Sequence, residues 1–93
     1  MPVGLLTLEL HIDHAQSLKD KRQVLRSLKD RLRGKFNVAV AELEGHDTWQ
    51  RSVVGVVTLS NEERHVHEVL QQVLAEADDL LGSLVVNQAI EVL

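Results

Sequence analysis

The sequence predicts an α+β fold in which a four-stranded antiparallel sheet carries two helices on one face. Three observations point to it. Apolar residues alternate with a period of two near the start of the chain, they recur at helical spacing in two later segments, and turn-forming residues separate these segments. With 93 residues, 44% of them apolar and 26% charged, the chain has the size and composition of one globular domain. We therefore expect a single domain over residues 1–93.

The first half of the chain predicts a strand followed by a helix. Leucines occupy alternate positions in Val3–Ile12, which is typical of a strand with one buried face. Asp13–Gln16 then forms a loop. Ser17 is placed to cap a helix over Leu18–Arg33, because an acidic residue follows it three positions later. Gly34 stands where a helix C-cap is expected.

The second half predicts a hairpin, a helix and a last strand. Phe36–Leu43 and Arg51–Leu59 are rich in β-branched and small residues, and the turn residues Glu44–Asp47 join them. Ser60–Glu63 matches a capping box, which opens the second helix. The apolar stripe of that helix consists of Val66, Val69, Leu70, Val73, Leu74 and Ala77. A Gly-Ser pair precedes the last strand, Leu84–Val92.

The resulting order, β-α-β-β-α-β, predicts the ferredoxin-like fold with the spatial strand order 4-1-3-2. Its two helices leave the other face of the sheet uncovered. An apolar surface of this kind usually marks an interface, and a symmetric homodimer is the simplest way to cover it. The candidate interface residues are Leu5, Thr7, Glu9 and His11 of the first strand and Ala39 and Ala41 of the second, with either Val54 and Val56 or Val53 and Val57 of the third.

Positive charge is concentrated in one segment of an otherwise acidic chain. Eight of the ten Lys and Arg residues fall within Lys19–Lys35, and the chain as a whole has a net charge of −4. With its two aspartates this segment carries about +6, and the rest of the chain about −10. A basic segment in a small acidic protein is a candidate site for an anionic partner, above all nucleic acid.

The helical spacing sorts these cations into a stripe and a remainder. At 100° per residue, five of them fall within about 80° of one another on a flank beside the leucine face. This stripe consists of Lys19, Arg22, Arg26, Lys29 and Arg33. Five cations in line suit a run of phosphates. The alternative is a solvated helix face whose cations pair with the helix's own aspartates or with acids on the second helix.

Lys21 departs from the stripe, because it points toward the leucine side of the first helical turn. A lysine there must extend its ammonium group to solvent or find a carboxylate, and Glu9 and Glu42 are the candidates. We expect a structural role for it.

No catalytic or metal-binding constellation emerges. The absence of Cys excludes disulfides, thiolate metal sites and Cys nucleophiles. The five His residues do not place two imidazoles on one face with a third ligand, and Ser52 and Ser60 lack a nucleophile setting. The acylphosphatase signature is missing after the first strand, where Asp13–Ser17 stands instead. We therefore expect no enzymatic activity, no metal and no cofactor.

The expected location is the cytoplasm, without a membrane partner. No basic segment precedes the first apolar run, and no stretch of 18 or more apolar residues exists.

The scarcity of aromatic residues limits how RNA could bind. Single-strand RNA readers of this topology stack bases on aromatic residues of the sheet. Phe36 lies at a strand start and Trp49 near the hairpin, so no such platform exists. Phosphate contacts from the stripe would carry the binding, with Arg51 adding to its edge. We expect Trp49 to plug the end of the sheet, and its alternative is a partly exposed contact residue.

Three segments together resemble the YlxP-like family of small bacterial proteins, domain of unknown function 503. They are Ser17–Arg22, Phe36–Glu42 and Asp47–Arg51. The resemblance implies a ferredoxin-like fold, a cytoplasmic location and dimers. It also implies association with RNA or the ribosome, because genes of this family often lie among those for translation factors and ribosome maturation. No activity is established for the family, so the resemblance implies a context and not a mechanism.

The sequence thus predicts a non-enzymatic protein that associates with RNA or the ribosome through the stripe. The alternative is a dimeric protein-interaction or small-ligand regulatory domain that uses the exposed face of the sheet.

Overall fold

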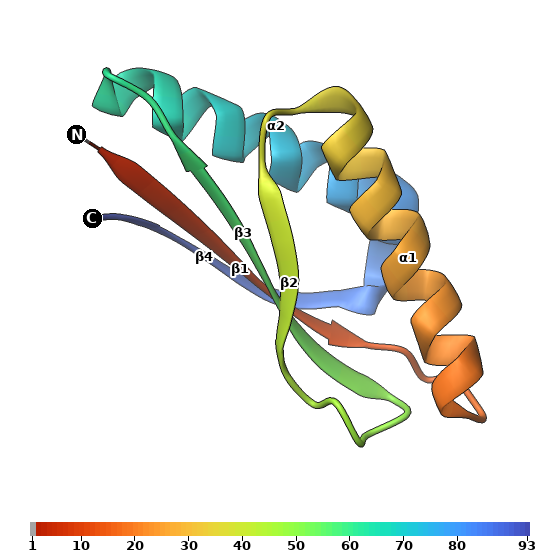
Figure 1. Cartoon of the computed structure of the whole chain (residues 1–93). Helices are drawn as coiled ribbons and strands as arrows, with labels where there is room; N and C mark the ends of the chain where they lie inside the picture. Colours follow the sequence, from red (N-terminus) through yellow and green to blue (C-terminus); the bar gives the residue numbers. More distant parts are fainter. Residues whose placement is uncertain (1) are drawn as a thin grey trace.

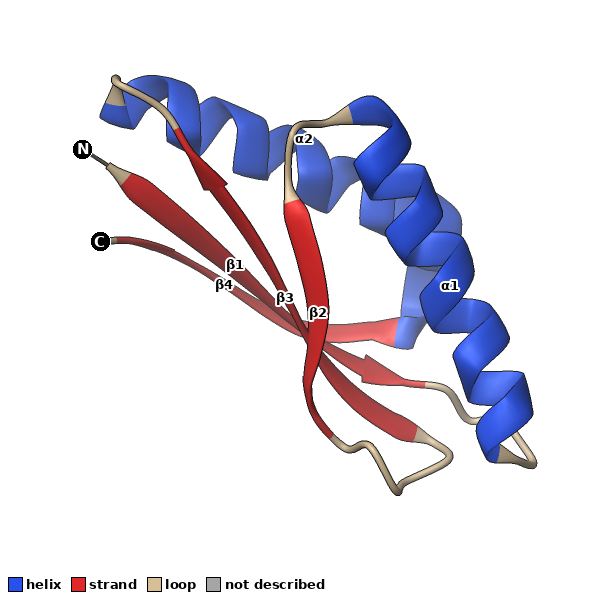
Figure 2. Ribbon diagram, in the orientation of Figure 1, coloured by secondary structure: helices blue, strands red, loops and turns tan. Residues whose placement is uncertain are grey.

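The chain folds into a four-stranded antiparallel sheet with two helices against one face (Figures 1 and 2). The computed structural model describes residues 2–93. Its elements are β1 (Val3–His11), α1 (Leu18–Lys35), β2 (Ala39–Glu44), β3 (Arg51–Leu59), α2 (Glu63–Leu81), a short 3₁₀ turn (Gly82–Leu84) and β4 (Val85–Val92). The predicted ferredoxin-like order of elements is confirmed.

The strand order is β2-β3-β1-β4, which is the predicted order counted from the opposite edge. All three neighbouring pairs are antiparallel. β1 and β3 are the central strands, so Leu6 pairs with Val56 and Leu8 with Val54 in the middle of the sheet. β2 and β4 are the edge strands, and β2 is the one that runs beside α1 (Figure 1).

The core lies between the sheet and the helices. Alternation in β1 sends Leu6, Leu8 and Leu10 toward the helices, where all three are fully buried. The helices meet them with one apolar stripe each, Leu28 and Leu32 from α1 and Val66, Leu70, Val73 and Ala77 from α2. Truncating one such leucine to Ala typically costs about 2–5 kcal/mol of stability. This core therefore fixes the position of α1 over the sheet.

The predicted end of the first helix is wrong. α1 continues through Gly34 to Lys35, and Phe36 follows it in extended conformation with its N–H bonded to the Leu32 carbonyl. Gly34 does not take a positive φ, so it does not act as a left-handed cap. The longer helix also displaces the second strand, which begins at Ala39 and not at Phe36.

The start of α2 also differs from its prediction. Ser60 is not the N-cap, because the helix begins at Glu63 and Glu62 occupies the cap position without a capping side chain. The Ser60 hydroxyl instead accepts a hydrogen bond from the Glu62 N–H at 3.3 Å, within the turn that precedes the helix. The S-x-x-E pattern is thus used as a turn. The last strand begins one residue later than predicted, at Val85, and the first ends one residue earlier, at His11.

Candidate functional site

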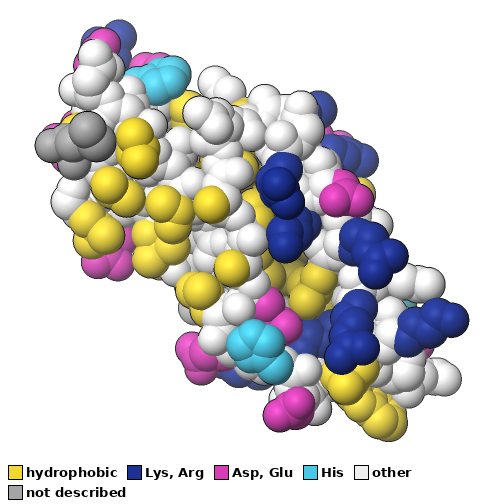
Figure 3. All heavy atoms as spheres, viewed as in Figure 1, with side chains coloured by type: hydrophobic (Ala, Val, Ile, Leu, Met, Phe, Trp, Pro, Cys, Tyr) yellow, Lys and Arg dark blue, Asp and Glu magenta, His cyan; other side chains and the backbone are white. Residues whose placement is uncertain are grey.

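The basic stripe of α1 is exposed along its length. In Figure 3 Lys and Arg side chains gather over α1, while most of the hydrophobic side chains gather over the strands. The start of the helix is fixed by Ser17, whose hydroxyl accepts the Asp20 N–H at 3.1 Å, as predicted. The Asp20 carboxylate in turn accepts the Gln16 N–H at 3.0 Å. This capping holds the first stripe residue in the first turn of the helix.

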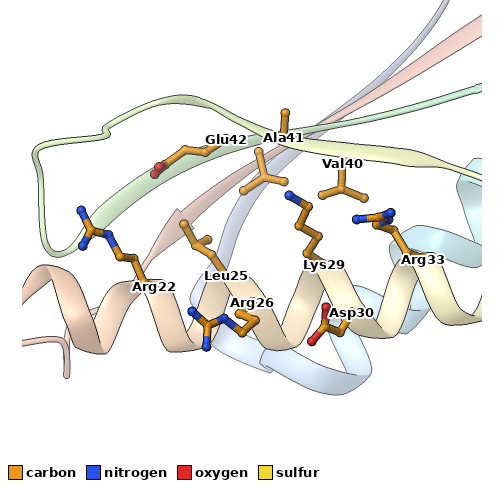
Figure 4. A pocket seen from close by; sticks show the side chains of 10 residues that line it. Arg22, Leu25, Arg26, Lys29, Asp30, Arg33, Val40, Ala41 and Glu42 are labelled. Atoms are coloured by element: carbon orange, nitrogen blue, oxygen red, sulfur yellow. The ribbon is translucent and has the colours of Figure 1, made fainter.

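A groove of about 470 Å³ separates α1 from β2 (Figure 4). Its lining combines cations with an apolar floor. The lining residues are Arg22, Leu25, Arg26, Lys29, Asp30 and Arg33 of α1, Val40, Ala41 and Glu42 of β2, and Val54 of β3. Four of the five stripe cations thus border the groove, and Lys19 lies outside it. Figure 4 shows the Lys29 side chain extending from the helix toward β2.

The stripe cations are not paired with carboxylates. Within residues 2–93, none of the five has a carboxylate oxygen within 4.0 Å. The other three cations of α1 are all paired. Arg31 lies 3.0 Å from Glu76 and 3.4 Å from Asp79, and Lys35 lies 2.9 Å from the same Glu76 carboxylate. Hydrogen bonds from Lys35 and Arg31 lower the pKa of Glu76. Pairing with acids of the second helix therefore applies to the opposite flank of α1 and not to the stripe.

Lys21 is buried and pairs with Glu42, one of its two predicted partners. Its Nζ lies 2.8 Å from Glu42 Oε2 and donates to the Thr48 carbonyl at 2.6 Å and to the Gly45 carbonyl. Ser52 Oγ donates to the same Glu42 oxygen at 2.6 Å. Burial raises the pKa of Glu42, but hydrogen bonds from Lys21 and Ser52 and the charge of Lys21 outweigh it, so the pKa is lowered overall. This cluster fastens the first turn of α1 to the β2–β3 hairpin.

The hairpin loop presents Trp49 to solvent, so its prediction as a plug is wrong. Its side chain is 51% exposed. The next residue, Gln50, ties the hairpin loop to the loop between β1 and α1, because its side-chain amide donates to the carbonyls of Asp13 and Ala15 at 3.2 Å. The Gln50 carbonyl also accepts the Ile12 N–H at 2.8 Å. These bonds anchor the backbone beside Trp49.

Arg51 is not brought to the stripe. It pairs with His11 in the sheet and lines a depression with Thr7 and Glu9 on the face opposite the helices. Alternation explains the separation, since the next residue, Ser52, is buried on the helix side. Arg51 therefore belongs to the uncovered face and not to the groove.

The uncovered face holds the predicted interface residues. Leu5, Thr7, Glu9 and His11 alternate with the buried leucines of β1, and Ala39 and Ala41 lie beside them through β3. The register of β3 against β1 shows which pair of valines lies on this face. Val54 and Val56 are buried under the helices, and Val53 and Val57 lie on the uncovered face.

Two large apolar residues of this face, Leu43 and Leu59, were not among the predicted ones. Their side chains are 48% and 60% exposed. The Leu43 side chain lies over Gly55, next to a β-bulge between Glu42 and Glu44. Leu43 lies two positions after Ala41 and Leu59 two positions after Val57, so the alternation of each strand is the signal that could have placed both residues on this face.

Neither a metal cluster nor a membrane-spanning helix occurs among residues 2–93. No group of three His, Asp or Glu side chains in this range is arranged to hold a metal ion. The helices of the same range are too short or too polar to cross a membrane.

Comparison with known proteins relates most of the chain to one family. A family model described as protein of unknown function (DUF503) matches residues 3–88. The uncharacterized protein YlxP of Bacillus subtilis (strain 168) is 40% identical over 76 residues, which are 82% of this chain and 83% of YlxP.

Similar solved structures share the fold at low sequence identity. The de novo designed protein Ferredog-Diesel matches with a TM-score of 0.60 at 14% identity, over 96% of this chain and 83% of that one. SnoaB, a cofactor-independent oxygenase from Streptomyces nogalater, matches with a TM-score of 0.54 at 12% identity, over 99% and 90% of the two chains. At these identities the likeness shows the ferredoxin-like fold alone.

Proposed function

The chain belongs to the family of proteins of unknown function DUF503, and we propose that it binds RNA, alone or within the ribosome, through the stripe on α1. Arg22, Arg26, Lys29 and Arg33 hold the phosphates along the groove, and Lys19 extends the contact at the first turn. The role is binding and not catalysis.

The proposal is carried by the difference between the cations of α1 that have a carboxylate partner and those that have none. Lys21, Arg31 and Lys35 each have a carboxylate partner, whereas the stripe has none within the described part of the chain. Solvated arginines without partners keep their full charge for a ligand. Because the rest of the chain is acidic, the surface outside the stripe does not attract a polyanion. The polyanion must therefore dock on this flank.

The groove adds a second line of support. Here the four cations border an apolar floor that includes Leu25 and Val40, and the Glu42 carboxylate at its rim is already bonded to Lys21. A sugar-phosphate chain can lie along the cations while its less polar parts contact this floor.

The experiment compares the wild type with the triple variant Arg22→Gln, Arg26→Gln, Arg33→Gln. Each tagged protein is incubated with bacterial extract, and co-purified RNA is measured with and without ribonuclease treatment. We expect RNA to accompany the wild type, ribonuclease to remove it, and the triple variant to lose most of it. Arg64→Gln on α2 is the charge-loss control, because that side chain is 89% exposed and distant in sequence from the stripe. Equal recovery by the triple variant would contradict the proposal.

A second function is favoured by the uncovered face of the sheet. Leu43, Val57 and Leu59 are all large, apolar and more than a third exposed there. We propose that two copies pack these faces together about a two-fold axis. The stripe lies on the helix side, so it stays accessible in such a dimer. This surface is also the one that the alternative role, a dimeric interaction or regulatory domain, would use.

Sedimentation at decreasing protein concentration tests the dimer. We expect a dimer in the wild type and a monomer after Leu59→Glu, since a charge replaces an apolar side chain that is 60% exposed in the single chain. Glu68→Lys on α2 is the matched control for a surface charge change and leaves the dimer intact. A monomeric wild type at every concentration would remove this second function.

A further inference from the structure

The largest apolar side chain of the molecule is half exposed on the loop between β2 and β3. Trp49 is the single tryptophan of the chain and is 51% exposed. The carbonyl of the preceding residue, Thr48, accepts a hydrogen bond from Lys21, which directly precedes the stripe residue Arg22 on α1. Glu42, the other partner of Lys21, lines the groove. The loop that carries Trp49 therefore borders the Arg22 end of the groove.

Both neighbours of Trp49 are anchored. Thr48 is tied through its carbonyl to the buried Lys21, and its N–H donates to the Gly45 carbonyl at 3.0 Å. On the other side, Gln50 is bonded to Ile12, Asp13 and Ala15 by the hydrogen bonds described above. The backbone on each side of the indole is thus fixed before any ligand arrives. A backbone held in this way loses little conformational entropy on binding.

We propose that Trp49 stacks on an unpaired base of single-stranded RNA whose phosphates lie along the stripe. This inference rests on the proposed RNA binding and specifies the class of RNA. A single strand offers both a phosphate chain and free base faces, and base stacking on an aromatic side chain is tolerant of sequence. A duplex buries its base faces, so it can use the cations but not the indole.

The geometry sets the size of the ligand. From Arg22 to Arg33 the stripe rises about 16 Å along the helix, at 1.5 Å per residue. Together with the loop at its Arg22 end, this length suits a segment within the range of about 4–16 nucleotides that single-strand binders cover. An oligoribonucleotide of about eight residues and mixed sequence is the probe, because stacking on an aromatic side chain tolerates every base.

Trp49 itself reports on the contact, because the chain contains no Tyr and no second Trp. The wild type is titrated with the single-stranded probe, with the same probe in a duplex, and with an abasic oligonucleotide of the same length. Binding is followed by the anisotropy of a label on the oligonucleotide, and stacking by indole fluorescence. We expect the single strand to quench the fluorescence. The abasic chain binds without quenching, and the duplex quenches less than the single strand.

Variants separate stacking from charge. Trp49→Ala lowers the affinity for the single strand by about tenfold or more and leaves the affinity for the abasic chain unchanged. Trp49→Phe restores most of the loss, because it keeps an aromatic face. Leu93→Ala is the control for an exposed apolar side chain, because Leu93 is bonded to Val3 at the other end of the sheet, and it changes neither affinity. Circular dichroism of each variant verifies that the fold is retained.

The outcomes are distinguishable. If the single strand binds without quenching the indole, and Trp49→Ala binds it as tightly as the wild type does, stacking is overturned and phosphate binding stands. If neither the single strand, the duplex nor the abasic chain binds, the RNA proposal fails as well. Stronger binding and quenching by polyglutamate than by RNA would assign this surface to an acidic protein partner and overturn the inference.

Discussion

The ammonium group of Lys21 lies 2.8 Å from the Glu42 carboxylate, although only 2% of the lysine side chain is exposed. Burying a charge is costly unless it is paired and hydrogen-bonded. Here the carbonyls of Gly45 and Thr48 complete the shell of the ammonium group, and Ser52 shares the carboxylate. The pair joins the helix that bears the stripe to the hairpin that forms the other wall of the groove. It therefore determines the geometry of the candidate site.

Replacing Lys21 with Met should destabilise the protein by about 3 kcal/mol. The methionine fills a similar volume, but Glu42 and two loop carbonyls lose their donor. Chemical denaturation measures the change in the free energy of unfolding. Lys19→Met is the matched control, because that lysine lies on the same helical turn and outside the core, and we expect a change within about 0.5 kcal/mol there. If the two substitutions changed the free energy of unfolding equally, the buried pair would stabilise the fold no more than an exposed lysine does.

Stability should fall on acidification, in part through Glu42. Its pKa is lowered in the folded state, so the unfolded chain binds more protons at acidic pH. The contribution is complete above the ordinary carboxyl pKa of about 4.3 and is lost as the pH falls through the lower folded value. Denaturation midpoints measured at a series of pH values should therefore decline less steeply in Glu42→Gln than in the wild type. Glu76 shares the same direction of pKa shift, so part of the decline remains. If the pH profiles of the wild type and of Glu42→Gln ran parallel, Glu42 would not contribute to the loss of stability in acid.

Two glycine substitutions should change stability in opposite directions. Gly45 has a φ of 91°, and a Cβ there would lie 2.6 Å from the Arg51 carbonyl oxygen. Gly45→Ala should therefore cost about 1–3 kcal/mol. Gly34 lies inside α1, and a Cβ there would meet no atom of another segment within 4 Å, so Gly34→Ala should stabilise by about 0.5–1 kcal/mol. Thermal unfolding of both variants checks the signs, and a stabilising Gly45→Ala would refute the strained turn.

The architecture follows from local patterns that the sequence displays directly. Alternation in β1 and the capping of α1 by Ser17 depend on residues close together in the chain, and both predictions are confirmed. The stripe is also a local property, since helical spacing alone places its five cations on one flank. The ends of the elements were harder to predict, because Gly34 and Ser60 carry typical signals that the tertiary structure does not use as caps.

The groove could not be predicted, because it depends on the separation between α1 and an edge strand. The exposure of Trp49 has a similar origin. The loop that carries this residue is held by hydrogen bonds of Gln50 and Lys21, which are contacts between distant segments. The inward position of Lys21 on α1 was visible in the helical spacing. The sequence left two candidate partners for it, and the register of β2 was needed to identify Glu42 as the actual one.

The dependence of RNA affinity on salt tests the central claim most directly. Four or five phosphate contacts to a single strand predict that log K falls with log salt at a slope of about −3. The triple variant Arg22→Gln, Arg26→Gln, Arg33→Gln should bring the slope to about −1, because each phosphate contact contributes about 0.7 to it. Arg31→Gln, whose arginine is paired with Glu76, should leave the slope near the wild-type value. A triple variant with the wild-type slope and affinity would contradict phosphate binding by the stripe.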